Sequence, residues 1–276
     1  NEISNEISNE IPNEIPNEIP NEISDEIPTD LKLLKGISLI IRAKNEELNI
    51  KDCIESVIDL VDEIIFVDNN STDSTYLIMK EYVEKYDKIK LYQYNINVSR
   101  AGNEHKIAIK NKYKNTLATF YNWCLSKASK YNVIKWDADF ICIRNNFIQM
   151  VDIYNLRERE DKFSIWFTGK TLFENDNNYY LNYQSFYDEY RVFSYKNGFK
   201  WYDGDICEHV EVYLKTCPIK YKYIYPVFYE IKRTSIDEFK ERSSLIDIRD
   251  IKDNNILNML KKEDNTGLMY VKNNII

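Results

Sequence analysis

Hydrophobic residues beyond residue 30 fall into two alternating patterns along the chain. Short, unbroken runs rich in Ile and Val predict buried strands, and apolar residues spaced by three or four positions predict amphipathic helices. Strands that alternate with helices in this way indicate a parallel sheet covered by helices. The expected strands lie at about 37–41, 64–67, 89–94 and 133–136, and the expected helices at about 50–61, 71–86 and 113–131.

Polar residues follow the expected strands directly, most clearly at Asp68 and at Asp137-Ala-Asp139. Ligands of open α/β sheets bind beyond the carboxyl ends of the strands, so these residues are candidates for a site. Two carboxylates separated by one residue at a strand end point to the same side, and their hard oxygen atoms suit Mg²⁺ or Mn²⁺ together with a phosphate. A solvated turn or a helix cap is the alternative interpretation, but the position after an apolar strand favours function.

The first 30 residues differ in composition from the rest of the chain. They hold seven Glu and two Asp without any Lys or Arg, so the formal net charge of −8 comes from this segment and the remainder is nearly neutral. Residues 1–28 repeat a tetrad, Asn-Glu-Ile-Ser or Asn-Glu-Ile-Pro, with a final Asp-Glu-Ile-Pro. Recurrent proline prevents a helix and like charges leave nothing to pack, so we expect a disordered acidic arm. It is either a spacing or partner-binding tail or an expansion without chemistry.

Charge and hydropathy exclude several classes of function for the body of the chain. A nearly neutral body gives no support for nucleic-acid binding driven by bulk charge. No apolar run approaches the roughly 20 residues that span a bilayer, and no secretory signal pattern is present, so we expect a cytoplasmic protein without a transmembrane segment. The five scattered cysteines contain no Cys-x-x-Cys pair, which fits reduced thiols.

Three segments, in order, resemble the signatures of family 2 glycosyltransferases with the GT-A fold. They are Ile37-Ser-Leu-Ile-Ile-Arg-Ala-Lys-Asn-Glu-Glu47, Val67-Asp-Asn-Asn-Ser-Thr-Asp-Ser-Thr75 and Trp136-Asp-Ala-Asp139. The resemblance is clear over 36–145 and implies one Rossmann-like, mixed but mainly parallel α/β sheet flanked by helices over 31–276. Within this domain we expect a nucleotide-binding half at about 31–145, an acceptor half at about 146–230 and a helical C-terminal region at about 231–276.

The resemblance also implies roles for single residues. Asp68 would contact the uracil or ribose of a nucleotide-sugar donor, and Asp139 would hold Mn²⁺ or Mg²⁺ on the diphosphate. Asn69 stands where the family often has a second Asp, and Tyr121 stands where one branch has an Arg before the Asn. The implied nucleotide-sugar-binding residues are Arg42, Ala43, Asn45, Glu46, Asp68, Asn122 and Asp137, and the implied metal ligands are Asp137, Asp139 and His209.

Segment 201–211 is the candidate region for the catalytic base, because it combines several carboxylates with one of the two histidines. Upstream, Arg191-Val-Phe resembles a motif of the branch that includes lipopolysaccharide-core and bacteriocin glycosyltransferases. In the register of that branch His209 fits as a metal or diphosphate ligand, and Glu208 or Asp205 would be the base. The alternatives are a partly buried structural histidine and carboxylates at a solvated helix start.

Two expectations concern residues outside these motifs. Aromatic faces suit sugar rings, so Trp166 and Trp201 are candidates for contact with the acceptor, whereas core packing accounts for most other aromatic residues. His105 lies in a segment rich in lysine and is expected to be a solvated loop residue.

The expected function is metal-dependent, inverting transfer of a sugar from a nucleotide-sugar donor, UDP-linked, to a glycan, protein or lipid acceptor. A divalent cation would neutralise the leaving diphosphate while a base takes the proton of the acceptor. Two alternatives stay open. One is a non-catalytic nucleotide- or sugar-binding relative, in which Asn69 and Tyr121 mark lost function. The other is a nucleotidyltransferase, although no glycine-rich basic loop lies near Ile41.

Overall fold

A computed structural model of the chain describes most of residues 33–233 and a short strand beyond them. The described residues are 33–111, 113, 115–161, 163–175, 178–186, 189–194, 199–204, 208–212, 219–233 and 245–247. For some of the later strands, including the one that contains Glu208 and His209, only the backbone is described. The repeat over residues 1–30 and Asp205 lie outside the described residues.

The first half of the domain is a parallel sheet with intervening helices, as the hydrophobic pattern predicts. Strand β1 is central and pairs in parallel with β2 on one side and β4 on the other, and β2 pairs in parallel with β3. The strands are β1 (Leu34–Ala43), β2 (Glu63–Asp68), β3 (Ile89–Gln93) and β4 (Lys130–Asp137), and the helices are α1 (Ile50–Val57), a short 3₁₀ helix (Ile58–Leu60), α2 (Thr75–Lys85), α3 (Asn103–Lys110) and α4 (Leu117–Ser126).

Antiparallel strands extend this sheet beyond β4. The order in the sheet is β12-β7-β6-β8-β4-β1-β2-β3, and β11 pairs with β6 and β5, while β9 and β10 form a separate ribbon. These elements are β5 (Phe140–Cys142), α5 (Arg144–Ile153), β6 (Phe163–Asn175), β7 (Asn178–Phe186), β8 (Glu189–Ser194), β9 (Phe199–Asp203), β10 (Glu208–Val212), β11 (Ile219–Arg233) and β12 (Leu245–Asp247). The expected mixed α/β sheet flanked by helices is thereby confirmed.

The expectation of a helical region over 231–276 is wrong wherever the structure describes that region. Residues 231–233 continue strand β11, and Leu245–Asp247 form strand β12, which pairs with β7. Long alternating runs of Tyr, Ile and Lys over Ile219–Arg233 satisfy strand geometry, in which successive side chains face opposite sides. The rest of 231–276 lies outside the described residues.

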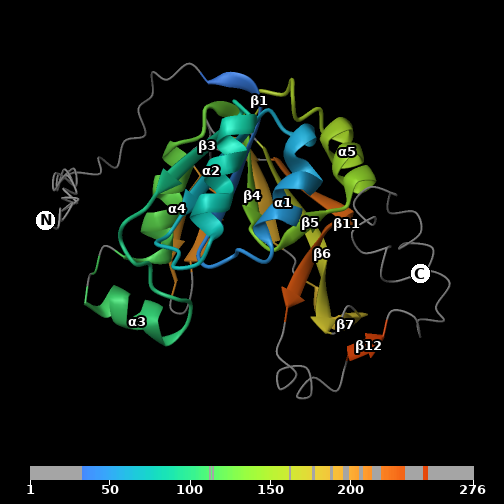
Figure 1. Cartoon of the computed structure of the whole chain (residues 1–276). Helices are drawn as coiled ribbons and strands as arrows, with labels where there is room; N and C mark the ends of the chain where they lie inside the picture. The colour runs from blue at the N-terminus through green and yellow to red at the C-terminus, as the bar shows by residue number, and fades with distance from the viewer. Residues whose placement is uncertain are drawn as a thin grey trace, which may run out of the picture. The chain divides into compact units, whose positions relative to one another are not determined.

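Helices cover both faces of the parallel strands. One core cluster contains apolar side chains of α1, α2 and α5 against β1 and β2, and a second contains those of α4 against the other face. Figure 1 shows α1 and α2 in front of the sheet, with β4 between and behind them. Every residue of β2 is buried, as expected for a strand covered on both faces. None of the described helices is long and apolar enough to cross a membrane.

Helix α3 was not expected from the sequence. It contains His105, which was expected to be a solvated loop residue. The imidazole of His105 is fully buried rather than solvated, and its Nε2 lies 3.7 Å from Oδ1 of Asp203. Asp203 Oδ1 also accepts a hydrogen bond from the backbone N–H of Ala118, at the start of α4. His105 and Asp203 therefore lie where α3, α4 and β9 meet.

Gly169 on β6 lies directly against the ring of Phe228 on β11. A Cβ atom at this position would overlap the ring of Phe228 on β11. That ring cannot move away easily, because it stacks on Phe140 with ring centroids 3.7 Å apart and meets Trp136 edge to face. Glycine is thus required here by packing.

We expect Gly169→Ala to lower the free energy of unfolding by about 1–3 kcal/mol through overpacking, measured by urea denaturation. In a Phe228→Leu background the smaller side chain leaves room for the methyl group, so the same change should have less than half that effect. An equal effect in both backgrounds would contradict the packing explanation.

Candidate active site

The registers of the parallel strands bring the candidate residues to one edge of the sheet. Ala43 at the end of β1 lies opposite Asp68 at the end of β2, and Arg42 lies opposite Asp137 at the end of β4. Carboxyl ends of parallel strands meet at the same edge, which is where ligands of such sheets bind. The structure therefore assembles residues that are separated by about a hundred positions in the sequence.

Side chains in the loops after β1 and β2 hold those loops together. The backbone N–H of Thr72 donates to Oδ1 of Asn45 at 2.7 Å, and Asn45 itself adopts a φ of 60°. The backbone N–H of Glu47 donates to Oδ2 of Asp73, and the backbone N–H of Ser74 donates back to Oε2 of Glu47. Several polar residues of the first two motifs, Asn45 included, are therefore engaged in loop structure.

The start of α2 is not stabilised by its N-cap side chain. Ser74 occupies the N-cap position, but its side chain makes no capping hydrogen bond. Oδ1 of Asp73 instead accepts hydrogen bonds from the backbone N–H and the hydroxyl of Thr75. Ser71 accepts from the backbone N–H of Asn45, so it links the two loops.

Asp68 keeps one carboxylate oxygen without a partner. The side chain is buried, and its Oδ2 accepts a hydrogen bond of 3.3 Å from the backbone N–H of Ser71. Its Oδ1 is buried and has no hydrogen-bond partner. Because a buried acceptor is expensive to leave unsatisfied, this atom is the best-placed acceptor at the edge for a ligand hydroxyl or N–H.

The hydrogen bonds of Asn69 explain why an amide, and not a second carboxylate, follows Asp68. Its Nδ2 donates to the carbonyl oxygens of Tyr94 and Ile96, and its Oδ1 accepts from the backbone N–H of Val98. An Asp at this position could not donate those two bonds. Asn69 thus fixes the segment after β3.

Asp137 is held between two buried arginines. Nη2 of Arg42 lies 2.9 Å from its Oδ1, and Nη1 of Arg191 lies 3.0 Å from its Oδ2. Burial alone would raise the pKa of Asp137, but the charges of Arg191, Lys135 and Arg42 hold it well below its usual range. Both oxygens therefore already accept charge-assisted hydrogen bonds, so Asp137 is poorly placed to be a metal ligand.

The ring of Tyr121 packs against the guanidinium group of Arg42. The guanidinium carbon of Arg42 lies 3.4 Å from the centroid of the Tyr121 ring, a cation–π contact. Tyr121 therefore orients Arg42 of β1 through the face of its ring.

Asp139 belongs to a compact group of charges between β4 and β11. Nζ of Lys232 lies 2.6 Å from Oδ2 of Asp139 and 2.8 Å from Oε1 of Glu230. Oε2 of Glu230 accepts from the hydroxyl of Thr171, and the backbone N–H of Ile231 donates to the Asp139 carbonyl. We call Asp139, Glu230 and Lys232 the Lys232 cluster.

Electrostatics within the Lys232 cluster follow from its burial. Burial is the main cause that raises the pKa of Asp139 to about 7; the ammonium of Lys232 opposes this rise, and the neighbouring Glu230 and Asp137 add to it. Burial of Lys232 acts to lower its pKa, but Asp139 and Glu230 outweigh this and raise it above its usual value. Sequence reasoning missed Glu230 and Lys232, although charged residues alternate with apolar ones at the end of β11.

The donor atoms of this cluster fit a divalent cation. Two carboxylates already surround one cation, the ammonium, and Mg²⁺ is commonly bound by one or two carboxylates together with substrate phosphates. Within the described part of the chain no group of three or more His, Cys, Asp and Glu could hold a metal by itself. Asp139 and Glu230 could therefore bind a cation that also has ligands from a diphosphate.

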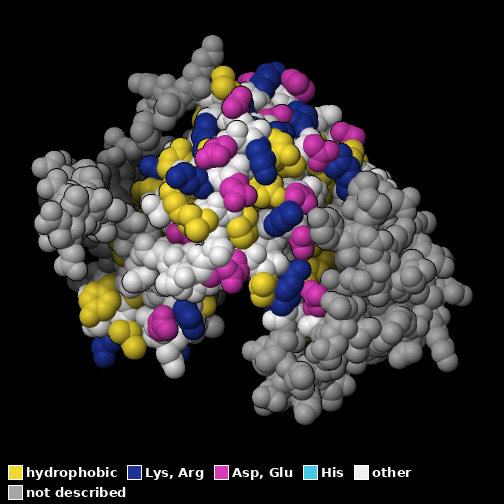
Figure 2. All heavy atoms as spheres, viewed as in Figure 1, with side chains coloured by type: hydrophobic (Ala, Val, Ile, Leu, Met, Phe, Trp, Pro, Cys, Tyr) yellow, Lys and Arg dark blue, Asp and Glu magenta, His cyan; other side chains and the backbone are white. Residues whose placement is uncertain are grey.

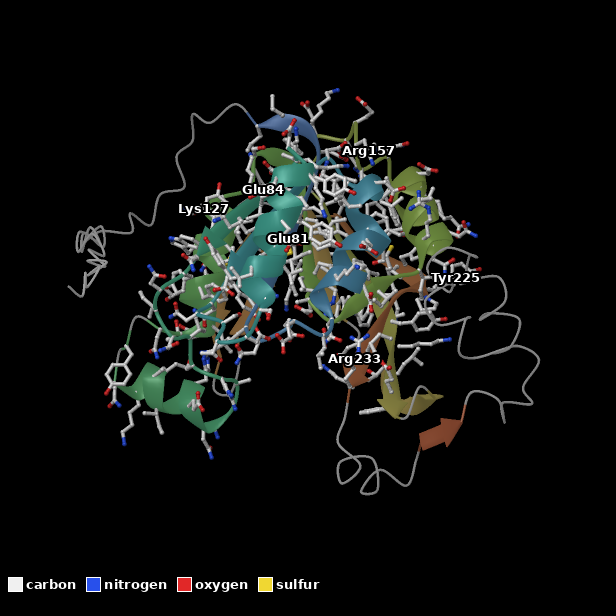
Figure 3. The ribbon with its side chains drawn as sticks, in the orientation of Figure 1. Glu81, Glu84, Lys127, Arg157, Tyr225 and Arg233 are labelled. Atoms are coloured by element: carbon white, nitrogen blue, oxygen red, sulfur yellow. The ribbon has the colours of Figure 1, made fainter. Side chains whose placement is uncertain are left out.

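Arg233 fixes the end of β11 beside the cluster. Its guanidinium bonds to Asn49 and Asp52 at the start of α1, and its Nε lies 3.1 Å from Glu174 on β6. Figure 3 shows Arg233 at the lower end of β11, below α1. Three elements next to Lys232 are thus tied together.

Two residues assigned to ligand binding prove to be structural. Nδ2 of Asn122 donates to the carbonyl of Trp201, and its Oδ1 accepts from the Trp201 N–H, so both ends of the amide are used. The Trp201 side chain is buried, packed on Tyr121 and Phe193. Tyr121 of α4 and Phe193 of β8 hold the Trp201 ring in the core, so it is poorly placed for the predicted contact with an acceptor.

The remaining candidates divide into placed and unplaced residues. Trp166 is partly buried and has Lys222 Nζ 3.8 Å from its ring centroid, about 16 Å along β6 from Thr171 at the usual strand rise. Glu46 accepts a hydrogen bond from Asn49, and burial raises its pKa. His209 lies opposite Tyr202 in the β9–β10 ribbon, but the side chains of Glu208 and His209 are outside the described residues, as is all of Asp205.

Comparisons with known proteins identify the family to which the chain belongs. The model of the family Glycosyl transferase family 2 matches residues 38–205, more than half of the chain. A curated relative, probable glycosyltransferase YdaM of Bacillus subtilis, is 39% identical over 67 residues, which are 22% of this chain and 16% of YdaM. The chain thus matches only a small part of that relative.

Two solved structures are similar at low identity. The structure of TarS 1–349 from S. aureus has a TM-score of 0.43 and 15% identity, covering 74% of this chain and 62% of that one. Glucosyl-3-phosphoglycerate synthase from Mycobacterium tuberculosis, in complex with Mn²⁺, UDP-glucose and phosphoglyceric acid, has a TM-score of 0.40 and 17% identity, covering 74% of each chain.

Proposed function

Because the chain belongs to glycosyl transferase family 2, we propose that it transfers a sugar from a nucleoside diphosphate sugar to an acceptor. The observation that carries the proposal is the edge of the sheet where Asp68 ends β2 and Asp139 of the Lys232 cluster follows β4, two strands that both pair in parallel with β1. One carboxylate there has a free acceptor atom, and the others already surround a cation.

Asp68 would bind the nucleoside. Its unpartnered Oδ1 accepts a hydrogen bond from a ribose hydroxyl or from the N–H of a uracil, and the Ser71 contact keeps the carboxylate oriented. UDP is the donor nucleotide that this interpretation favours. Asn69 contributes by fixing the segment after β3 rather than by binding the base itself.

Asp139 and Glu230 would hold the divalent cation, Mn²⁺ or Mg²⁺, through one oxygen each. When bound, the cation stabilises the negative charge that develops on the departing diphosphate. Asp137 does not share this role, because Arg42 and Arg191 hold both its oxygens. It keeps those two guanidinium groups in place at the edge.

Residue roles on the acceptor side of the reaction are proposed from the sequence motifs alone. Glu208 or Asp205 would take the proton from the acceptor hydroxyl, and one such base with one direct attack implies inversion. His209 remains a predicted ligand of the metal or diphosphate. A glycan, a protein or a lipid would be the acceptor, and Trp166 remains a predicted contact for it.

Nucleotide binding tests the proposal directly. UDP with Mn²⁺ should raise the Tm of the wild-type chain, since a ligand at about 100 times its Kd stabilises the folded state by about 2.7 kcal/mol. In Asp68→Asn the lost charge and acceptor geometry should weaken UDP binding by about tenfold or more, which is the usual scale for a charge-assisted hydrogen bond.

The matched control is Asp87→Asn, an exposed acid beyond α2 that should leave UDP binding unchanged. GDP, ADP and CDP in the same assay identify the preferred base. If no nucleoside diphosphate stabilises the wild type in the presence of Mn²⁺, the proposed function is wrong.

A further inference from the structure

We propose that Lys232 is a built-in cation that competes with the divalent metal for the carboxylates of Asp139 and Glu230, so that the metal binds tightly only together with a diphosphate. This inference rests on the proposed function for the identity of the metal and of the diphosphate. The residues that carry it, Glu230 and Lys232, lie outside the three sequence motifs.

The geometry places the ammonium where a cation would be bound. Nζ of Lys232 is within 2.8 Å of one oxygen from each carboxylate, and the side chains of Asp139 and Glu230 are only 12% and 11% exposed. Thr171 holds the second oxygen of Glu230, so this carboxylate is oriented toward the ammonium and cannot turn freely to a second cation.

Charge and geometry both disfavour binding of a metal ion and the Lys232 ammonium to the two carboxylates at the same time. A metal ion bound to the same two oxygens would lie next to the ammonium, and like charges at that distance repel strongly in a partly buried site. Carboxylate oxygens engaged by an ammonium must also lose those hydrogen bonds before they bind a metal. The metal therefore has to displace Lys232.

Displacement of Lys232 is feasible because of its position. The Lys232 side chain is 39% exposed, whereas the two acids are nearly enclosed, so its flexible stem has a path to solvent. Arg233, the next residue, stays bound to Asn49, Asp52 and Glu174, which keeps the end of β11 in place while the lysine moves.

A diphosphate changes the balance between the two cations. Its negative charge adds ligands for the metal and also provides a new partner for the released ammonium. Metal and nucleotide should therefore bind with positive coupling, and each should strengthen the binding of the other by the same factor. Without nucleotide, Lys232 keeps the acids neutralised and metal binding weak.

Calorimetric titration of Mn²⁺ into the full chain without nucleotide tests this competition. Lys232→Gln removes the charge and should bind Mn²⁺ about tenfold or more tightly than the wild type, since it removes the repulsion between like charges. Lys220→Gln, a change of an exposed lysine on the same strand, is the matched control and should leave the Kd unchanged. Glu230→Gln combined with Lys232→Gln should lose the gain, because one of the two acidic ligands is removed.

An unchanged Mn²⁺ affinity in Lys232→Gln would overturn the proposal. Should this variant fail to fold in EDTA, refolding with Mn²⁺ is the second measurement. Recovery of the native circular dichroism spectrum would support the exchange of one cation for the other, and no recovery at saturating Mn²⁺ would contradict it. The titration uses no nucleotide, so its result is independent of whether UDP binds, which tests the proposed function separately.

Discussion

Replacing Asp139 by Ala should abolish Mn²⁺-dependent nucleotide binding and lower kcat for transfer or donor hydrolysis by at least about 10³-fold. The reason is that Asp139 is the nearly enclosed carboxylate that would hold the cation at the diphosphate, and such a cation contributes several kcal/mol to charge stabilisation in the transition state. The variant also leaves Lys232 with Glu230 alone, so any remaining binding of UDP should no longer depend on Mn²⁺.

Thermal stabilisation by UDP, with Mn²⁺ and with EDTA, measures this effect, together with assays on a panel of UDP- and GDP-sugars. Asp59→Ala is a suitable control, because Asp59 is an exposed acid in the 3₁₀ helix after α1, paired with Arg144, whereas Arg233 beside the cluster contacts the start of α1. A variant at position 139 that keeps wild-type Mn²⁺ dependence would remove Asp139 from the proposed metal site. Transfer by the wild type would also exclude the non-catalytic alternative.

Asp137→Asn should lower the free energy of unfolding by about 3 kcal/mol, which is roughly 10 °C in Tm for a chain of this size. The side chains of Arg42 and Arg191 are only 7% and 4% exposed, so Asp137→Asn removes the one carboxylate that these two buried positive charges share. Asp137 itself is 35% exposed, and we therefore use the lower end of the range for broken buried pairs.

The pH dependence has a definite sign. The folded-state pKa of Asp137 is lowered, so its contribution is complete above its unfolded-state value of about 3.9 and is lost as the pH falls. Denaturant titrations of wild type and Asp137→Asn at neutral and acid pH should therefore converge at low pH. Divergence toward low pH would contradict the ion-pair explanation.

Asp161→Asn is the matched control for this prediction. Asp161 also pairs with an arginine, Arg159, but its side chain is 52% exposed, so the pair should contribute less than about 1 kcal/mol. Arg191→Met combined with Asp137→Asn should be less destabilised than the sum of the single changes, because the two changes remove both partners of one ion pair.

Charge is mixed rather than clustered over the described part of the face in Figure 2, where Lys and Arg alternate with Asp and Glu. This agrees with a body of nearly neutral net charge and gives that face no polyanion-binding patch. The informative charges are instead the partly enclosed ones at the edge of the sheet, Asp68, Asp137 and the Lys232 cluster.

Much of the first half of the fold could be predicted because its signals are local. Runs such as Ile64-Ile-Phe-Val67 can only be buried, and helices between them fix parallel pairing, so the strand ends and their polar residues had to share one edge. Helix α3 escaped prediction because it is short and mostly polar, and burial of His105 depends on contacts with α4 and β9.

Within the candidate site, the sequence identified the motif residues but not the side chains that contact them. Asp68, Asp137 and Asp139 could be selected from strand-end position and spacing alone. Their different environments could not, because Arg191 and Lys232 approach from β8 and β11, strands far away in the sequence. The same holds for Asn122, whose amide is used by the Trp201 backbone rather than by a ligand.

The sequence by itself determined the parallel α/β half of this protein, the edge at which its polar residues gather and its family resemblance. These follow from hydrophobic periodicity and from residues near one another in the chain. Only the tertiary structure decided that Asp137 is neutralised by arginines, that Trp201 is core, and that the ammonium of Lys232 lies between the carboxylates of Asp139 and Glu230. The physical reason is that a carboxylate's chemistry is set by the charges and burial around it, and those come from distant segments brought together by folding.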